Sequence, residues 1–146
     1  MTATLEEFQQ AFKTEALEVY TNDSWTWSVR PQQPTLGASV LSMKRFAARL
    51  SEMTEKEARD LRDAVTVMEG ALQKTFGFEK FNYLMLMMVD DHVHYHCIPR
   101  YSGEKTHDGQ AFPDTGWPKF PDLAADVTGG DDAALASIVG ELRKNL

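Results

Sequence analysis

The segment from His92 to Ile98 constrains the fold more than any other part of the chain. Its sequence is His-Val-His-Tyr-His-Cys-Ile, so three of the four histidines of the protein alternate with apolar or aromatic residues. Residues two apart on a β-strand project from the same face, so His92, His94 and His96 would lie together while their neighbours enter the core. The segment therefore predicts a strand that presents a row of imidazoles on one face of a sheet.

Helical and strand-like patterns share the rest of the chain, which predicts an α+β fold. Helical spacing of apolar residues, preceded each time by a residue that can cap a helix, is found in three segments: 4–20, 54–76 and 131–142. Strand patterns occupy four segments: 24–30, 38–43, 78–89 and 92–98. Asp90-Asp91 is predicted to be a tight turn that joins the last two strands into a β-hairpin. We expect an antiparallel sheet of about five strands, with the histidines on a central strand and one long and one or two shorter helices packed on it.

The length of 146 residues fits a single domain, because two separate cores would each be small and marginal. Four parts are predicted within this domain: an N-terminal helix (1–23), a core that contains the histidine strand (24–100), a long ordered loop or lid (101–130) and a C-terminal helix (131–146). The third part is rich in Gly, Pro and Asp and has no periodicity.

Composition narrows the classes of partner and the cellular location. The net charge of −7 argues against a protein that binds duplex nucleic acid by neutralising phosphates. The longest apolar run, Tyr83–Val89, is much shorter than the ~18 residues expected of a membrane span. Cys97 is the only cysteine, so no internal disulfide can form, and the first residues lack the pattern of a secretory signal. A cytoplasmic location is therefore expected.

Three interpretations of the histidine row are open. The histidines could lie on the surface of an ordinary strand. They could bind a metal, but same-face neighbours are about 6.6 Å apart, so one ion would take two of them and a third ligand from elsewhere, such as His107. Alternatively, the row could line an extended anionic substrate, since an unperturbed pKa of about 6.5 lets imidazole act in either protonation state. In that case His94 is favoured as the nucleophile, because it alone has an imidazole on each side.

The triad segment, followed by Pro99-Arg100, closely resembles the signature of the histidine triad (HIT) superfamily of nucleotide hydrolases and transferases. It is most similar to the dinucleoside polyphosphate hydrolase or fragile-histidine-triad branch, and the order of elements from Trp25 to Tyr101 is also similar. The resemblance implies an enzyme with a HIT-like sheet that cleaves a nucleotide α-phosphate bond in a dinucleoside polyphosphate-like substrate through a covalent nucleotidyl-histidine intermediate. The alternatives are a nucleoside phosphoramidase and a non-catalytic nucleotide-binding sensor or adaptor.

The resemblance also implies roles for single residues. His94 would attack the α-phosphorus, His96 would contact the phosphate and the scissile bond, and His92 would orient the row by hydrogen bonding. Three further residues are candidates for substrate binding: Arg30, Arg100 and Trp27. No tightly bound cofactor and no protein-bound metal are expected, apart from Mg²⁺ carried by substrate phosphates. Related proteins pair through their sheets, which implies a homodimer.

Two positions depart from the pattern of the superfamily. Its members usually have a Gly-x-Gln-Ser/Thr loop before the triad, whose polar side chains bind the phosphate or the leaving group. Here that place holds Met88-Val-Asp-Asp91, which has two carboxylates and no Gln, Ser or Thr. Ala38 follows Gly37 where many relatives have a histidine. The triad is intact, but two carboxylates beside a polyphosphate site would repel the substrate.

Overall fold

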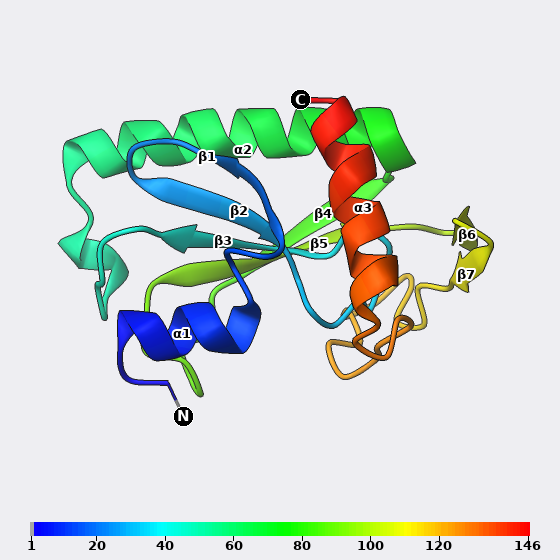
Figure 1. Cartoon of the computed structure of the whole chain (residues 1–146), viewed down its shortest axis with the longest axis horizontal. Helices are drawn as coiled ribbons and strands as arrows, with labels where there is room; N and C mark the ends of the chain where they lie inside the picture. The colour runs from blue at the N-terminus through cyan, green and yellow to red at the C-terminus, as the bar shows by residue number, and fades with distance from the viewer. Residues whose placement is uncertain (1) are drawn as a thin grey trace.

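The computed structural model describes residues 2–146, and a five-stranded antiparallel sheet lies at its centre (Figure 1). The strands are β1 (Glu18–Thr21), β2 (Trp25–Val29), β3 (Ser39–Met43), β4 (Lys80–Leu84) and β5 (His94–Arg100). Their order in the sheet is β1-β2-β3-β5-β4, so β5 is hydrogen-bonded on both sides. The predicted α+β fold, the number of strands and the internal position of the histidine strand are confirmed.

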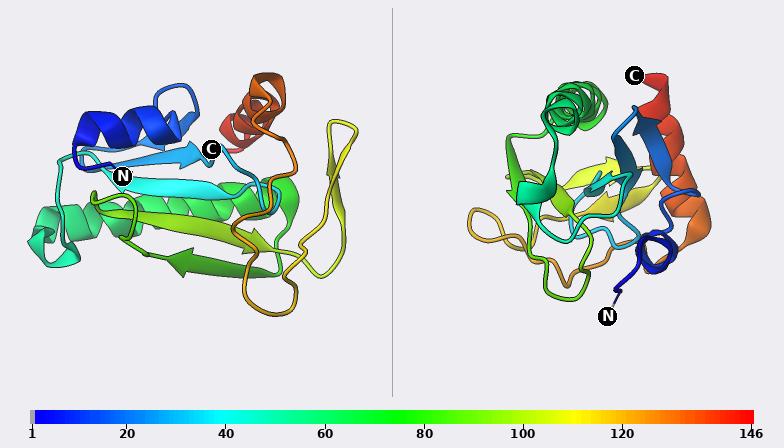
Figure 2. Two further views of the ribbon diagram at one scale, coloured as in Figure 1. Left: turned by 90° about the horizontal axis from the view of Figure 1, so that it is seen from below. Right: turned by 90° about the vertical axis from the view of Figure 1, so that its left-hand side faces the viewer.

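Three α-helices surround the sheet: α1 (Leu5–Phe12), α2 (Glu55–Phe76) and α3 (Asp132–Lys144). The right-hand view of Figure 2 shows α2 and α1 on opposite sides of the sheet. The helix α3 packs against β1, β2 and α2 and contributes four buried apolar residues to the core: Leu135, Ile138, Val139 and Leu142. No helix within residues 2–146 is both long enough and apolar enough to cross a membrane.

The long helix α2 begins and ends where its sequence predicts. The Thr54 side chain accepts a hydrogen bond from the Glu57 backbone N–H, and the Glu57 carboxylate accepts one from the Thr54 N–H in return. At the other end Gly77 adopts a left-handed conformation with φ of 66°. Gly37 packs against this helix, since a Cβ added there would lie only 2.8 Å from Leu72 Cδ2.

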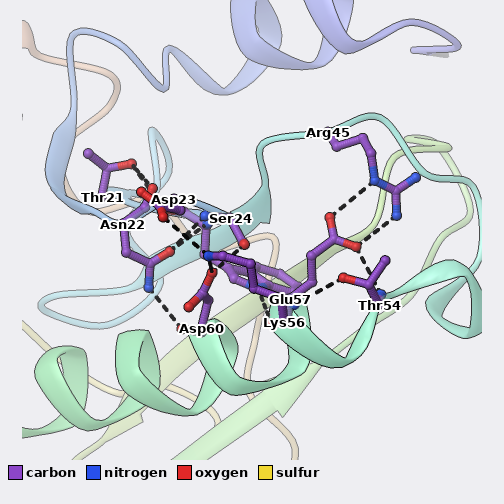
Figure 3. Close-up of polar contacts among 10 residues, drawn as sticks. Thr21, Asn22, Asp23, Ser24, Arg45, Thr54, Lys56, Glu57 and Asp60 are labelled. Carbon is purple, nitrogen blue, oxygen red and sulfur yellow. Dashed lines mark hydrogen bonds and ion pairs between the residues drawn. The ribbon is translucent and has the colours of Figure 1, made fainter.

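A polar network fixes the first turns of α2 to the β1–β2 turn and to the chain after β3 (Figure 3). Ser24 Oγ and Lys56 Nζ both donate to the Asp60 carboxylate, at 2.5 and 2.7 Å. Arg45 donates to both carboxylate oxygens of Glu57, which is the main cause that lowers the pKa of Glu57 to about 2. The long helix is thereby held on one face of the sheet and leaves the other face to the histidines.

The strand register separates two sheet faces with different roles. Trp25, Trp27 and Val29 point toward α2 and belong to the main hydrophobic core, together with Cys97. On the opposite face, His96 of β5 lies in one row across the sheet with Val40 and Ser28, and His94 lies in the next row with Ser42 and Thr26. The predicted division of β5 into a core face and an imidazole face is therefore correct.

The N-terminal helix is shorter than its apolar spacing predicts. Thr4 caps α1 as expected, but the helix ends at Phe12, and Lys13 takes a left-handed conformation with φ of 51°. Residues 18–21 pair with β2 as strand β1, and Leu17 and Val19 enter the core. The prediction of a helix over 4–20 is therefore wrong beyond Phe12, because pairing with a neighbouring strand outweighs a local helical pattern.

Two connections also differ from expectation. The strands β4 and β5 are antiparallel neighbours, but β4 ends at Leu84 and β5 begins at His94. Residues 85–93 therefore form a loop in place of the predicted tight turn, and the His92 position precedes the strand. The segment 101–130 is not structureless throughout, since it contains the hairpin of β6 (Lys105–His107) and β7 (Gln110–Phe112).

Candidate active site

The imidazole row is covered by helix α1. The Phe8 ring lies 5.0 Å from the His92 ring and 4.9 Å from the His94 ring, measured between centroids. The Phe12 ring lies 5.5 Å from His94 and 5.9 Å from His96. All three imidazoles are consequently buried. This contradicts the interpretation as surface histidines and places the row inside an enclosed site.

Both ring nitrogens of His92 bind backbone groups. Nε2 lies 2.5 Å from the Met43 carbonyl oxygen, which can only accept, and Nδ1 lies 3.3 Å from the Ala47 N–H, which can only donate. These partners assign the proton to Nε2 and a neutral ring. Burial lowers the pKa of His92 as well. The ring therefore ties the end of β3 to the start of the histidine strand and has no nitrogen left for a ligand.

His94 has one ring nitrogen fixed and the other free. Nδ1 lies 2.6 Å from the His92 carbonyl oxygen, so it carries the proton and donates it. Nε2 therefore holds a lone pair, and it has no hydrogen-bond partner among residues 2–146. Burial lowers the pKa of His94, which keeps this lone pair unprotonated at neutral pH. An oriented, neutral imidazole of this kind can act as a nucleophile.

His96 is held in the opposite tautomer by Arg30. The Arg30 Nε–H donates to His96 Nδ1 at 3.3 Å, so the proton of the neutral His96 ring lies on Nε2. Burial, with smaller contributions from the Arg30 charge and from His94, lowers the pKa of His96 to about 4. His96 can thus offer a hydrogen-bond donor next to the free lone pair of His94, whose ring centroid is 5.0 Å away.

Replacing Arg30 with Met is expected to raise the pKa of His96. Removal of the cation removes one cause of the low value, while burial, the larger cause, remains, so the new pKa should lie between about 4 and the ordinary 6.5. NMR titration of the imidazole resonances measures this directly. Because the pKa of His96 is lower in the folded than in the unfolded chain, stability is lost as the pH falls from 6.5 toward 4, and the variant should lose less. An unchanged His96 titration would show that Arg30 does not control this ring.

A cavity of about 400 Å³ opens beside His94 and His96. One wall comes from α1 and the chain after β2 and includes Phe12, Arg30 and Gln32. The other wall is the loop after β4, with Leu86, Met87, Met88, Val89 and Asp90. The cavity therefore borders His94 and His96 between a partly polar wall and a largely apolar one.

Asp90 is the acidic residue of the lining, and the N-terminal segment holds it in place. Thr2 Oγ1 donates to Asp90 Oδ1 at 2.6 Å, and two backbone hydrogen bonds flank this contact, from Thr2 N–H to Val89 O and from Asp91 N–H to Thr2 O, both at 3.0 Å. The Asp90 charge acts on His94 and His96, whose pKa values it raises against the larger effect of burial. Asp91 is not part of the cavity lining.

Two of the predicted substrate-binding residues lie elsewhere. Trp27 is fully buried on the α2 face of the sheet, where its Nε1–H donates to Ser39 Oγ at 2.9 Å, so this candidate does not line the cavity beside the histidines. Arg100 is also buried, and it donates to the Asp114 carboxylate at 2.7 Å and to Asn82 Oδ1 at 2.7 Å. It lines a different hollow from that of the triad. Of the three candidates, only Arg30 reaches the histidines.

The apolar wall of the cavity differs from what the sequence predicts. The Leu and Met residues between β4 and β5 continue the strand pattern of 78–89, so the sequence predicts that they lie on a strand of the sheet. Met88 is instead 76% exposed at the cavity mouth. One feature of the sequence does point to this wall: the segment just before the triad contains no Gln, Ser or Thr. The resemblance implies that this segment lies next to the substrate.

No family sequence model matches the chain, and no curated protein matches it in sequence. Solved structures of histidine triad proteins are similar. One from Sinorhizobium meliloti 1021 has 18% sequence identity and a TM-score of 0.75, with 98% of this chain and 96% of that chain covered. One from Bradyrhizobium japonicum has 16% identity and a TM-score of 0.69, with 88% and 89% covered. The diadenosine triphosphate hydrolase of Plasmodium falciparum has 13% identity and a TM-score of 0.66, with 89% and 76% covered.

The chain thus has the histidine triad fold, as the sequence resemblance predicts. The likeness extends over nearly the whole chain and includes the N-terminal helix and the C-terminal helix, which lie outside the segment that carries the sequence resemblance. At these identities the structural likeness defines the fold alone.

Proposed function

We propose that the protein cleaves the bond between the α-phosphate of a nucleotide and a leaving group through a covalent intermediate on His94. The observation that carries the proposal is the pairing of tautomers at the cavity: His94, with its lone pair on Nε2, and His96, with its proton on Nε2, both belong to the cavity lining. One nitrogen can bond to phosphorus while the other donates a hydrogen bond to a phosphoryl oxygen.

The reaction has two steps. His94 Nε2 attacks the α-phosphorus, the bond to the leaving group breaks, and the leaving group takes its proton from solvent. The Nδ1 proton stays on His94, where its hydrogen bond to the His92 carbonyl offsets the positive charge of the phosphorylated ring. Water then attacks phosphorus and releases a proton to solvent, the P–N bond breaks, and a nucleoside monophosphate leaves with His94 neutral again. His96 Nε2–H and Arg30 stabilise negative charge on the phosphoryl oxygens in both steps.

The site residues can perform this chemistry without a resident metal. Both ring nitrogens of His92 are engaged by the backbone, so the three histidines cannot serve as a common ligand set. Mg²⁺ carried by substrate phosphates would be compatible with the cavity, since it would enter with the substrate. The homodimer and the cytoplasmic location stay predictions that rest on the sequence.

A second candidate function is nucleotide binding without turnover, as in a sensor or adaptor. The apolar loop and Asp90 favour it, because they lie where relatives are expected to bind phosphate with polar side chains. One solved structure of the same fold, from Sulfolobus tokodaii, is described as a hypothetical histidine triad nucleotide-binding protein. The two functions differ in whether His94 becomes covalently modified.

Mass spectrometry of the quenched reaction tests the proposal. The protein is mixed with a panel of dinucleoside polyphosphates and nucleoside phosphoramidates, with and without a chelator, and quenched in denaturant without acid. The expected result is a mass increase of one nucleoside monophosphate on the peptide that contains residues 92–100. Tight nucleotide binding with no adduct and no product for any substrate would contradict hydrolysis and support the binding module.

A further inference from the structure

We propose that Asp126 is a positioning residue that acts through Arg30 and limits how tightly the site holds a phosphate. The inference rests on the proposed function, in which Arg30 stabilises the phosphoryl oxygens, and it adds a means of releasing the product. Asp126 belongs to the connecting segment 113–131, which joins β7 to α3 and has no role in the two chemical steps.

The connecting segment is docked on the chain that follows β2. The Gln33 N–H donates to Asp126 Oδ1 at 3.0 Å, and the Val127 N–H donates to the Gln33 carbonyl oxygen at 3.1 Å. The Thr128 hydroxyl donates to the same Asp126 oxygen at 3.1 Å. These hydrogen bonds hold the Asp126 carboxylate near the end of β2, where Arg30 also lies.

The Arg30 guanidinium is fixed on one side and free on the other. Its Nε donates to His96 Nδ1, and its Nη1 donates to the carbonyl oxygens of Gln32 at 3.2 Å and of Leu123 at 3.5 Å. Leu123 lies in the connecting segment, which therefore contacts Arg30 directly. The Nη2 group has no hydrogen-bond partner among residues 2–146 and is not fully buried. Because Arg30 lines the cavity, Nη2 is the nitrogen that remains for a bound phosphate.

The charge of Arg30 is buried, and Asp126 compensates it in part. The Arg30 residue is 8% exposed, and a buried charge without a counter-charge is costly. Burial lowers the pKa of the Arg30 guanidinium, and the charge of Asp126 acts in the opposite direction. The two side chains form no direct ion pair within residues 2–146, so the counter-charge acts through space and leaves Nη2 free. A partly compensated cation holds an anion less tightly, which favours release of the nucleoside monophosphate.

Asp126→Asn tests the inference, because an amide oxygen can accept the hydrogen bonds from Gln33 and Thr128 while the charge is lost. Isothermal titration calorimetry at low salt is carried out with the 5′-monophosphates of adenosine, guanosine, cytidine and uridine. We expect the Kd of the tightest of them to fall by about three- to tenfold in the variant. If Asp126 only held the connecting segment in place, the variant would bind equally or more weakly, and that result would overturn the inference.

Three further variants show whether Asp126 acts through Arg30. Asp122→Asn removes the same charge from an exposed position of the same segment and should change the Kd by less than about twofold. Asp126→Glu keeps the charge and should keep the Kd of the wild type. In an Arg30→Met background, Asp126→Asn should have little effect, because the cation that it modulates is gone. An equal effect with and without Arg30, or an equal effect of Asp122→Asn, would show a general change of charge and contradict the inference.

NMR titration of the imidazoles supplies a measurement that needs no ligand. Loss of the Asp126 charge leaves the Arg30 cation uncompensated beside His96, so the His96 pKa, about 4 in the wild type, should move lower in Asp126→Asn. The other groups that act on this pKa, His94 and Asp90, are unaltered. A shifted His96 titration without nucleotide binding or adduct would contradict the proposed function and retain the coupling between Asp126 and Arg30. An unshifted titration together with an unchanged Kd would overturn the inference and leave the proposed function intact.

Discussion

His94→Ala is expected to lower kcat by about three orders of magnitude or more, because the variant has no nitrogen that can bond to phosphorus. Nucleotide affinity should change little, since Arg30, Gln32 and the loop wall remain. The covalent adduct on the peptide of residues 92–100 should disappear. Single-turnover kinetics and isothermal titration calorimetry measure the two effects separately.

The comparison needs variants that separate chemistry from folding. His94→Asn keeps a side chain of similar reach beneath Phe8 and Phe12 and should be as inactive as the alanine variant. His107→Ala is the matched control, because His107 is the histidine outside the row and contacts only Ser137 Oγ among the described hydrogen bonds. Near-normal turnover in His94→Asn, or an adduct that maps to His92 or His96, would contradict the proposed mechanism.

Arg100→Met is expected to destabilise the fold by about 3–5 kcal/mol while leaving the KM for nucleotide unchanged. The Arg100 and Asp114 side chains are 5% and 1% exposed, and Asp114 also accepts the Tyr101 N–H. Loss of the guanidinium would leave a buried carboxylate without its counter-charge, which costs far more than loss of a surface pair. Thermal denaturation should show a melting temperature lower by about 10 °C.

Two further variants test the cause of this loss. Lys56→Met removes exposed ion pairs with Asp23 and Asp60 and should cost less than about 1 kcal/mol. The double variant Arg100→Met/Asp114→Leu removes both buried charges and should recover most of the stability that Arg100→Met loses. A rise in nucleotide KM with unchanged stability would instead return Arg100 to the substrate-binding residues that the sequence predicted.

Elements with strong local signals could be predicted from the sequence. The helix α2 has a capping box at Thr54, a long apolar stripe and a glycine at its end, and each of these acts over a few residues. The alternation in 92–98 likewise predicts β5 and its two faces. Both features depend mainly on neighbours in the sequence, although β5 begins at His94, two residues later than the pattern predicts.

Elements that depend on distant contacts could not be predicted in this way. The helical spacing in 4–20 continues past Phe12, but β1 forms because residues 18–21 can pair with β2. The turn expected at Asp90-Asp91 does not form, because these residues pair with Thr2 instead. The contacts between Thr2 and Asp90 do not arise from a periodic pattern in either segment, so the sequence pattern does not predict them.

The histidine row of the candidate site could be predicted from the sequence, and the residues around it could be predicted less well. Alternation marks two faces on β2 but does not say which face carries the site, so Trp27 is a candidate for substrate binding from the sequence although it faces α2. Arg30, which lies just past the end of β2, proved to contact His96. The partner of each side chain across a sheet depends on the order of the strands. No single segment of the sequence determines the order β1-β2-β3-β5-β4.

The contacts of Thr2 have a practical consequence for work with this protein. Thr2 is bonded to Val89, Asp90 and Asp91, which places the start of the described chain beside the cavity wall. An affinity tag or fusion partner joined before Thr2 would emerge next to this cavity and could obstruct it or add its own charge there. The exposed C-terminal residue Leu146 lies on the other side of the molecule in Figure 1, so tags and surface attachment for kinetic work belong at that end.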